Sequence, residues 1–229
     1  MRGTIEAVGV LVPARDEEQR IGRCLDAVHR ALRHAGVPGL VCVVADRCTD
    51  RTADVAAGRA EVVGTTRPRP IGAVRDLGAR RLLGRLPGAA WILSTDADSV
   101  VPRSWVADHL RHAAAGADAV AGAVELDDPG TLPEIVRERY DRVLRAPSRT
   151  GTGHAYAAAL GVRASALRAV GGFPAVPVGE EHALLARLRA AGFAVVWADD
   201  AAVRTSARTV GRATGGLAGL LADLRTEVP

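Results

Sequence analysis

The sequence "AAWILSTDADSVV" (residues 89–101) joins a short apolar run to two closely spaced carboxylates. Its first half, "AAWIL", is typical of a buried strand with apolar residues on both faces. Asp96 and Asp98 follow where that strand is expected to end, and alternation along an extended chain predicts that both point to the same side. Carboxylates this close repel, so the pKa of one should rise unless a cation or donor holds them. A positive group is therefore expected beside this DxD sequence.

Similar apolar runs recur along the chain and alternate with stretches of helical period. The predicted strands span 7–14, 40–45, 61–65, 90–95 and 118–126. Apolar residues at helical spacing between the first two strands indicate one helix, and 50–58, 72–84 and 103–114 fit three more. This order of elements predicts an α/β fold, with a mostly parallel, Rossmann-like sheet and helices on both faces.

The second half of the chain is less regular. A predicted helix over 131–145 leads into the Gly- and Ala-rich stretch "GTGHAYAAALGVR" (151–163). A further helix over 180–191, a short strand over 194–198 and a Gly-rich C-terminal segment follow. Because no internal repeat and no linker interrupts the pattern, we expect one domain over 1–229.

The composition limits the possible chemistry. The chain has 229 residues, 48% hydrophobic and only 3% aromatic, which indicates a globular core of small aliphatic side chains. All 30 basic residues are Arg, so the absence of Lys excludes Schiff-base enzymes, pyridoxal phosphate attachment and a P-loop lysine. The net charge of +4 suits an anionic ligand, but the arginines lie among acids and aromatic residues are scarce. We therefore do not expect nucleic acid as a partner.

The cysteines and the hydropathy bear on location. The three cysteines, Cys24, Cys42 and Cys48, are odd in number and form no CxxC pair, which favours a reduced, cytoplasmic protein. No apolar stretch approaches the ~20 residues that span a bilayer, and no signal-peptide pattern opens the chain. We expect no transmembrane segment, although a lipid-linked acceptor at a membrane surface remains compatible with the sequence.

Acidic residues follow three of the predicted strands. Open α/β sheets bind ligands at the carboxyl ends of their strands. The segments found there are "PARDEE" (13–18), "DRCTDRT" (46–52) and "TDADS" (95–99). A divalent metal, Mg²⁺ or Mn²⁺, would reconcile these acidic walls with an anionic ligand. Asp46 precedes the expected helix cap, so its carboxylate is available to accept a hydrogen bond from a ligand such as a nucleobase.

Two carboxylates also begin the predicted helix 180–191. Glu180 and Glu181 lie in its first turn, where the helix dipole favours negative charge, and one of them could face the cleft as a general base. His182 lies next to this pair. His109, in contrast, falls on an apolar helical stripe, which predicts a packed histidine rather than a metal ligand.

Taken in chain order, five segments resemble the family-2 glycosyltransferases of the GT-A fold. "VLVPARDEEQRIGRCLDAV" (10–28) resembles the first strand and helix of that family, and "VVADRCTDRTADVA" (43–56) is similar to its DD-G-S-T-D segment. "IGAVRDLGARRL" (71–82) resembles the ARNxG helix start, and "LSTDADS" (93–99) the DxD segment. "AVGGFPAVPVGEEHALLARLRAAG" (169–192) resembles the acceptor-side GGF…ED segment. Beyond these five, "EEHALLARL" (180–188) followed by "VRTSARTVGRATGGL" (203–217) resembles a subgroup of small bacterial members that end in a TSxR segment.

The resemblance implies an inverting, metal-dependent transfer of a sugar from a nucleoside diphosphate sugar to an acceptor hydroxyl. It implies a nucleotide-binding half, 1–115, and an acceptor-binding half, 116–229. Glu181 would be the general base, beside Glu180, and a metal would be held by Asp98 with help from Asp96. The residues implied in nucleotide-sugar binding are Pro13, Ala14, Glu17, Asp46, Arg75, Asp96, Arg208 and Arg212.

The sequence departs from the family at several positions. Asp16 stands where Asn is more usual, Glu181 where Asp is more common, and Thr205-Ser206 where a late metal-binding His often occurs. The last metal ligand, the donor base, the sugar, the acceptor and the oligomeric state therefore stay open.

Two other readings stay open. "WILSTDADSVV" also fits the start of a haloacid-dehalogenase-like phosphatase with Asp96 as nucleophile, although two strand–helix units precede it and the phosphate-facing Lys is missing. A non-catalytic nucleotide-sugar-binding protein is the other alternative. A dinucleotide-binding Rossmann protein is not favoured, because no GxGxxG follows the first strand.

Overall fold

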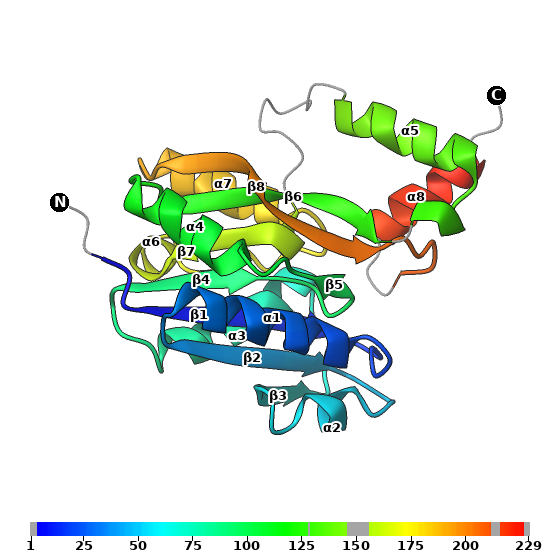
Figure 1. Cartoon of the computed structure of the whole chain (residues 1–229). Helices are drawn as coiled ribbons and strands as arrows, with labels where there is room; N and C mark the ends of the chain where they lie inside the picture. The colour runs from blue at the N-terminus through cyan, green and yellow to red at the C-terminus, as the bar shows by residue number, and fades with distance from the viewer. Residues whose placement is uncertain (1–3, 128, 146–155, 212–215, 227–229) are drawn as a thin grey trace.

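The computed structural model describes residues 4–127, 129–145, 156–211 and 216–226. They form a sheet in the order β3-β2-β1-β4-β7-β6-β8-β5 (Figure 1). The strands are β1 (Ala7–Ala14), β2 (Gly39–Asp46), β3 (Glu61–Thr65), β4 (Ala90–Ser94), β5 (Ser99–Val100), β6 (Ala119–Asp127), β7 (Leu160–Arg163) and β8 (Val195–Ser206). The helices are α1 (Ile21–Ala35), α2 (Thr52–Ala56), α3 (Ile71–Leu83), α4 (Trp105–Ala114), α5 (Glu134–Arg145), α6 (Ala164–Ala169), α7 (Glu180–Ala190) and α8 (Leu217–Thr226).

The first half of the sheet is parallel, as predicted. β1 pairs in parallel with β2 and β4, and β2 pairs in parallel with β3. Every residue of β1 is buried, and its alternate side chains enter two different cores: Val8 and Val10 pack on one face, Leu11 on the other. This explains why the strand is apolar without alternation.

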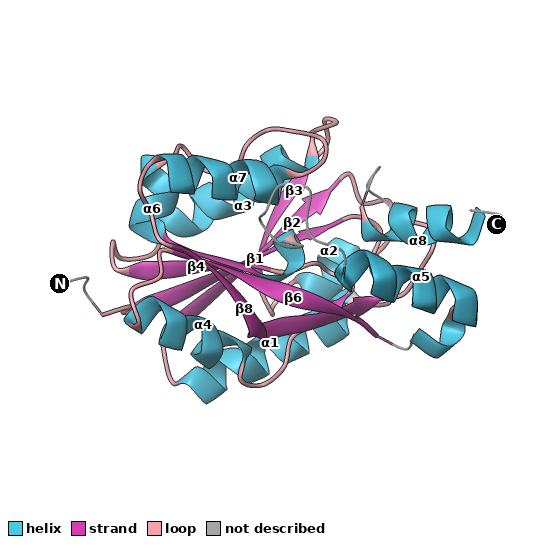
Figure 2. Ribbon diagram, turned by 90° about the horizontal axis from the view of Figure 1, so that it is seen from above, coloured by secondary structure: helices cyan, strands magenta, loops and turns pink. Residues whose placement is uncertain are grey.

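Helices cover both faces, and this part of the predicted fold is confirmed. In Figure 2, α1 and α4 lie on one side of the sheet, and α3, α6 and α7 lie on the other. Each helix contributes an apolar stripe to the core on its own side. The ends of the strands stay uncovered by these helices, which leaves the edge formed by the strand termini available for a site.

The second half of the sheet is mixed and was only partly predicted. β7 lies between β4 and β6 and is antiparallel to both, while β6 is parallel to β8. β7 has only four residues inside a Gly- and Ala-rich stretch, so its sequence gives no strand signal of its own. β8 runs to Ser206, well past the predicted 194–198, and α6 and α8 were not predicted.

Helices α5 and α8 lie side by side at one end of the molecule (Figure 1). Their apolar faces pack together in a small cluster formed by Leu132, Val136, Tyr140, Ala207, Leu221 and Leu224. Ala207 belongs to the segment that follows β8. Its burial therefore fixes the path of the backbone just beyond the end of that strand.

His109 is a packed histidine, as predicted. Its ring lies against Trp91 and Trp105, with centroids 6.4 and 5.3 Å away, and the residue is fully buried. Neither ring nitrogen makes a hydrogen bond to any described residue. Burial, followed by repulsion from His112, lowers the pKa of His109 to about 3, and Asp200 opposes only part of this shift.

Acid should therefore destabilise the fold through His109. Since the pKa in the folded state lies below the unfolded value, the unfolded state binds more protons, and stability is lost as pH falls below about 6.5. The limiting slope is about 1.4 kcal/mol per pH unit. Urea unfolding of wild type and His109→Met between pH 7 and 5 measures it. The variant should lose this slope, whereas exposed His34→Gln should keep it; equal slopes in all three proteins would contradict the assignment.

A glycine contact sets the distance between α3 and the start of α7. The amide of Gly72 donates to the carbonyl of Val176 at 3.3 Å, and a Cβ on Gly72 would lie 1.8 Å from the carbonyl oxygen of Pro174. This close approach brings Arg75, one turn further along α3, towards Glu180. A side chain at position 72 would push the two elements apart.

Gly72→Ala should therefore destabilise the protein by about 1–3 kcal/mol, since the clash outweighs the better helix propensity of Ala. The matched control is Gly219→Ala in α8, where a Cβ meets no atom within 4 Å. That control should be neutral or slightly stabilising. Chemical denaturation of both variants measures the effect, and equal stabilities would show that the contact is not restrictive.

Candidate active site

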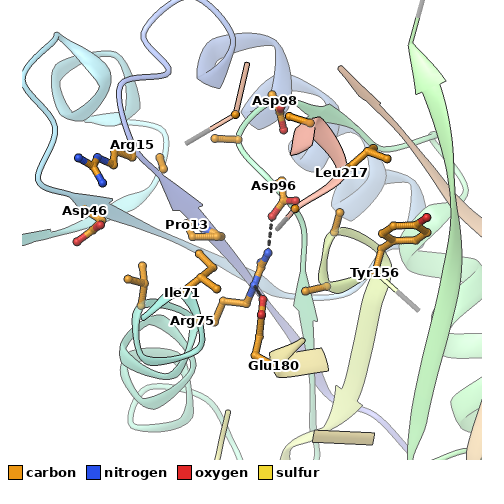
Figure 3. Close-up of a pocket in the computed structure, with 18 of the residues that line it drawn as sticks. Pro13, Arg15, Asp46, Ile71, Arg75, Asp96, Asp98, Tyr156, Glu180 and Leu217 are labelled. Atoms are coloured by element: carbon orange, nitrogen blue, oxygen red, sulfur yellow. Dashed lines mark hydrogen bonds and ion pairs between the residues drawn. The ribbon is translucent and has the colours of Figure 1, made fainter. Parts of the chain in front are cut away.

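A cavity of about 430 Å³ opens at the carboxyl ends of β1, β2 and β4. Its walls include every predicted site residue that the described part of the chain contains: Pro13, Ala14, Glu17, Asp46, Arg75, Asp96, Asp98, Glu180, Glu181 and Arg208. Figure 3 shows how several of these side chains converge from separate elements. Arg212 lies outside the described residues. Residues as far apart in the sequence as Pro13 and Arg208 therefore meet in one cavity.

Arg75 is the central cation of this site. Its Nε donates to Glu180 at 2.8 Å and its Nη2 to Asp96 at 2.6 Å (Figure 3). Its Nη1 donates to Ser94 at 2.7 Å. The side chain is almost fully buried. Burial lowers the pKa of Arg75, but Asp96 and Glu180 more than offset it, so the net pKa lies above its usual value and the guanidinium stays charged.

These contacts give Arg75 a second role beside the predicted one. We expected it to offset the charge of a diphosphate, and its three nitrogens also bind protein oxygens. It connects α3 to the DxD loop and to the first turn of α7. Arg75 therefore orients Asp96 and Glu180.

The two DxD aspartates do not lie along an extended strand, contrary to the expectation from alternation. β4 ends at Ser94 and β5 begins at Ser99, so Asp96 and Asp98 occupy the turn between them. Their carboxylates meet different cations: Asp96 binds Arg75, and Asp98 Oδ2 lies 3.0 Å from Nη2 of Arg208. The positive charge expected beside the DxD is present as two arginines.

Asp98 is the more buried of the two aspartates, with 10% of its side chain exposed against 36% for Asp96. Burial, followed by repulsion from Asp96, raises the pKa of Asp98 to about 6, while Arg208 opposes the shift. The pKa of Asp98 is thus raised although a cation is present, mainly because of burial, whereas the sequence argument considered only the repulsion between the two carboxylates.

Asp46 lies at the far end of the cavity, after β2. Its Oδ1 accepts from Thr65 Oγ1 at 2.5 Å, and its Oδ2 lies 3.4 Å from Nη2 of Arg47. The carboxylate is therefore less available than predicted, although each oxygen keeps a second lone pair. Arg15 and Arg47 also line this end of the cavity. Sequence reasoning missed both. Arg15 directly follows β1 and Arg47 directly follows β2, and site residues are expected at these carboxyl ends of strands.

Glu180 and Glu181 play different structural roles. Glu180 is buried and bound to Arg75; burial raises its pKa, and Arg75 works against that shift. Glu181 lies 3.1 Å from Nδ1 of His182. Burial alone would raise the pKa of Glu181, but the hydrogen bonds from His182 and the backbone outweigh it and lower the pKa. Glu181 is therefore ionised at neutral pH and lines the cavity.

The carboxylates that could hold a metal lie in two places. Within the described residues, the group of three possible ligands whose atoms lie within 4.8 Å of one another is Asp16, Cys48 and Asp50, not the DxD. Asp16 accepts from the amide of Thr49, and Asp50 from that of Glu18, so these carboxylates tie the loops after β1 and β2 together. The DxD offers Asp98 and the more exposed Asp96, each with an arginine in place.

Tyr156 and Thr205 complete the wall on the side of the second half. Tyr156 comes from the Gly- and Ala-rich stretch, where no periodicity marks it as a site residue. Thr205 stands where the family resemblance places a metal-binding His, and its hydroxyl donates to Asp98 Oδ1 at 3.4 Å. The hydroxyl thus faces the DxD loop.

The fold is similar to that of several solved glycosyltransferases. TarS from S. aureus in complex with UDP-GlcNAc matches with a TM-score of 0.61 and 16% identity over 90% of this chain and 60% of that one. A mannosyltransferase from Pyrobaculum calidifontis in complex with GDP-Man and Mn²⁺ matches at 0.64 and 19%, over 90% and 57%. Glucosyl-3-phosphoglycerate synthase from Mycobacterium tuberculosis with Mn²⁺, UDP and phosphoglyceric acid matches at 0.62 and 18%, over 89% and 72%.

These similarities establish the GT-A fold. The chain spans about 60% of the length of the TarS and mannosyltransferase chains. No curated protein matches the sequence significantly. None of the described helices combines the length and apolar character needed to cross a bilayer.

The family assignment rests on the sequence itself. The family model described as "Glycosyltransferase like family 2" matches residues 6–214, which include β1, the DxD loop, α7 and the segment carrying Arg208. Because this match covers most of the chain, the protein belongs to glycosyltransferase family 2.

Proposed function

We propose that this protein transfers a sugar from a nucleoside diphosphate sugar to an acceptor hydroxyl, with inversion and with a divalent metal, Mg²⁺ or Mn²⁺. The observation that supports this most is the convergence of the DxD loop, Asp46 and Glu181 on one cavity in a family-2 chain. UDP-GlcNAc in TarS and GDP-Man with Mn²⁺ in the mannosyltransferase illustrate the class of donor. Residues 1–115 would bind the nucleotide and 116–229 the acceptor.

The end of the cavity near Asp46 suits the nucleoside. Asp46 would accept from the base, Arg15 and Arg47 would flank it, and Pro13 and Ala14 would form the floor at the end of β1.

The DxD end suits the diphosphate. Asp98, supported by Asp96, would hold the metal, which when bound would stabilise the charge that develops on the leaving diphosphate. Arg75 fixes the orientation of Asp96 through the 2.6 Å ion pair. Arg208, and Arg212 on the same C-terminal segment, would add positive charge near the diphosphate.

Glu181 would take the proton from the acceptor hydroxyl. It lines the cavity and is ionised at neutral pH, two properties that a general base requires. Glu180, bound to Arg75, is better suited to hold the first turn of α7 in place than to move a proton.

The phosphatase alternative loses its support. A nucleophilic Asp96 would have to leave its 2.6 Å ion pair with Arg75, and the chain belongs to a glycosyltransferase family. A non-catalytic role is tested by the turnover experiment below. The cytoplasmic location inferred from the cysteines remains a prediction.

Nucleotide binding tests the donor site. A donor present at a hundred times its Kd stabilises the fold by about 2.7 kcal/mol, which raises the Tm by about 5–10 °C for a chain of this size. Thermal unfolding with UDP, GDP and their sugars, with and without Mn²⁺, should show such a shift for one nucleotide class. Asp98→Asn should lose the metal-dependent part, while Asp54→Asn, an exposed carboxylate in α2, should keep it. A Tm unchanged by every nucleotide would contradict the proposal.

Turnover distinguishes the two glutamates. Glu181→Gln should lower the release of nucleoside diphosphate from the donor by about 10²–10⁴, because it removes the base without removing a hydrogen-bonding group. Its Tm should stay close to wild type. Glu180→Gln should instead lower the Tm, since Arg75 would lose a charged partner in a buried position. The roles would be wrong if Glu181→Gln kept full turnover.

A further inference from the structure

Arg208 bridges two carboxylates that come from different strands. Its Nη1 lies 2.5 Å from Oε1 of Glu17, in the loop after β1, and its Nη2 lies 3.0 Å from Oδ2 of Asp98, in the loop after β4. Both acids line the cavity, and so does Arg208. A single guanidinium therefore occupies the point between two convergent carboxylates.

Glu17 has coordinating capacity that the protein does not use. The residue is 4% exposed, yet its Oε2 makes no hydrogen bond to any described residue. Nη1 of Arg20 lies 3.8 Å from Oε2, on a side chain that is 42% exposed. A buried carboxylate oxygen without a donor is costly, so a ligand that binds it is favoured.

The backbone around Glu17 is held independently of its side chain. Its amide donates to Thr52 Oγ1 at 2.7 Å, and its carbonyl accepts from the amide of Ile21 at the start of α1. Glu17 can therefore exchange one cation for another without moving the loop.

The backbone near Arg208 is held independently of its guanidinium. Thr205 pairs with Ser99 of β5 through the sheet and through a 2.9 Å hydroxyl hydrogen bond, and Ala207 is buried between α5 and α8. The Arg208 side chain itself is 21% exposed. Its long side chain can therefore swing within the cavity while the chain before it stays in place.

We propose that Glu17 and Asp98 form a cation site that Arg208 fills in the free protein and a divalent metal takes over. Glu17 then supplies a carboxylate ligand that the DxD alone lacks, and the displaced guanidinium stays in the cavity, free to face the diphosphate. The two cations exclude each other because they compete for the same oxygens and repel at this distance. This inference rests on the metal-dependent donor site of the proposed function.

The test is a titration of the free protein with Mn²⁺, in which electron paramagnetic resonance measures the concentration of unbound Mn²⁺. Arg208→Gln removes the competing cation and should bind Mn²⁺ about tenfold more tightly than wild type, a change of about 1.4 kcal/mol. Glu17→Gln should bind it about tenfold more weakly. The gain from Arg208→Gln should disappear in the double variant, because both changes act on one site.

Arg20→Gln is the matched control. This variant also loses one positive charge near Glu17. The Arg20 side chain is exposed and does not contact Asp98, so the Mn²⁺ affinity of the variant should stay within about threefold of wild type. Thermal unfolding gives a second measure. In the presence of EDTA, Arg208→Gln should be less stable than wild type, and saturating Mn²⁺ should stabilise it by more than it stabilises wild type.

The outcomes separate this inference from the proposed function. Unchanged or weaker Mn²⁺ binding in Arg208→Gln, or unchanged binding in Glu17→Gln, overturns it even if the enzyme turns over its donor. Equal gains in Arg208→Gln and Arg20→Gln also overturn it, since they would reflect general charge alone. If wild type and Arg208→Gln both fail to bind millimolar Mn²⁺ but still bind a nucleotide sugar, the shared cation site is wrong and the transferase assignment stands.

Discussion

The buried guanidinium of Arg75 is the constraint on which the site depends. A charge out of contact with water must be paired, and Arg75 is paired by Asp96 and Glu180 at 2.6 and 2.8 Å. Those two acids belong to the DxD loop and to α7, so one cation joins three elements that are distant in sequence. The glycine contact at Gly72 makes this possible, because it lets α3 approach the segment before α7 closely enough for the bridge to form.

A second bridge mirrors the first on the other side of the DxD. Arg208 connects Asp98 to Glu17, much as Arg75 connects Asp96 to Glu180. The two differ in burial and therefore in freedom: the Arg75 side chain is 5% exposed, whereas that of Arg208 is 21% exposed and extends from the segment beyond β8. The buried Arg75 therefore holds the elements of the site together, whereas the more exposed Arg208 can exchange with a ligand. The two arginines thus offset part of the negative charge of the four carboxylates that they bind, which reduces the repulsion between these acids.

Much of the site could be predicted from local sequence. The strand before the DxD, the acids after β1 and β2, and the paired glutamates at the start of α7 all carry signals in a few neighbouring residues. The rule that ligands bind at the carboxyl ends of strands then places them together. The ion-pair and hydrogen-bond partners of these side chains were harder to predict. Arg75 was expected to face a diphosphate, and only the folded chain shows that Asp96, Ser94 and Glu180 already occupy its nitrogens.

The α/β class, the parallel half of the sheet and most acids of the cavity wall follow from the sequence, because apolar periodicity and strand-end polarity are local properties. The mixed half depends on tertiary contacts. β7 has four residues in a stretch without periodicity, and it becomes a strand because β4 and β6 offer it hydrogen bonds from both sides. The pairing of each carboxylate with its arginine was likewise decided in three dimensions. A chain with 30 arginines offers each acid many possible partners, and only burial and distance select the one that binds.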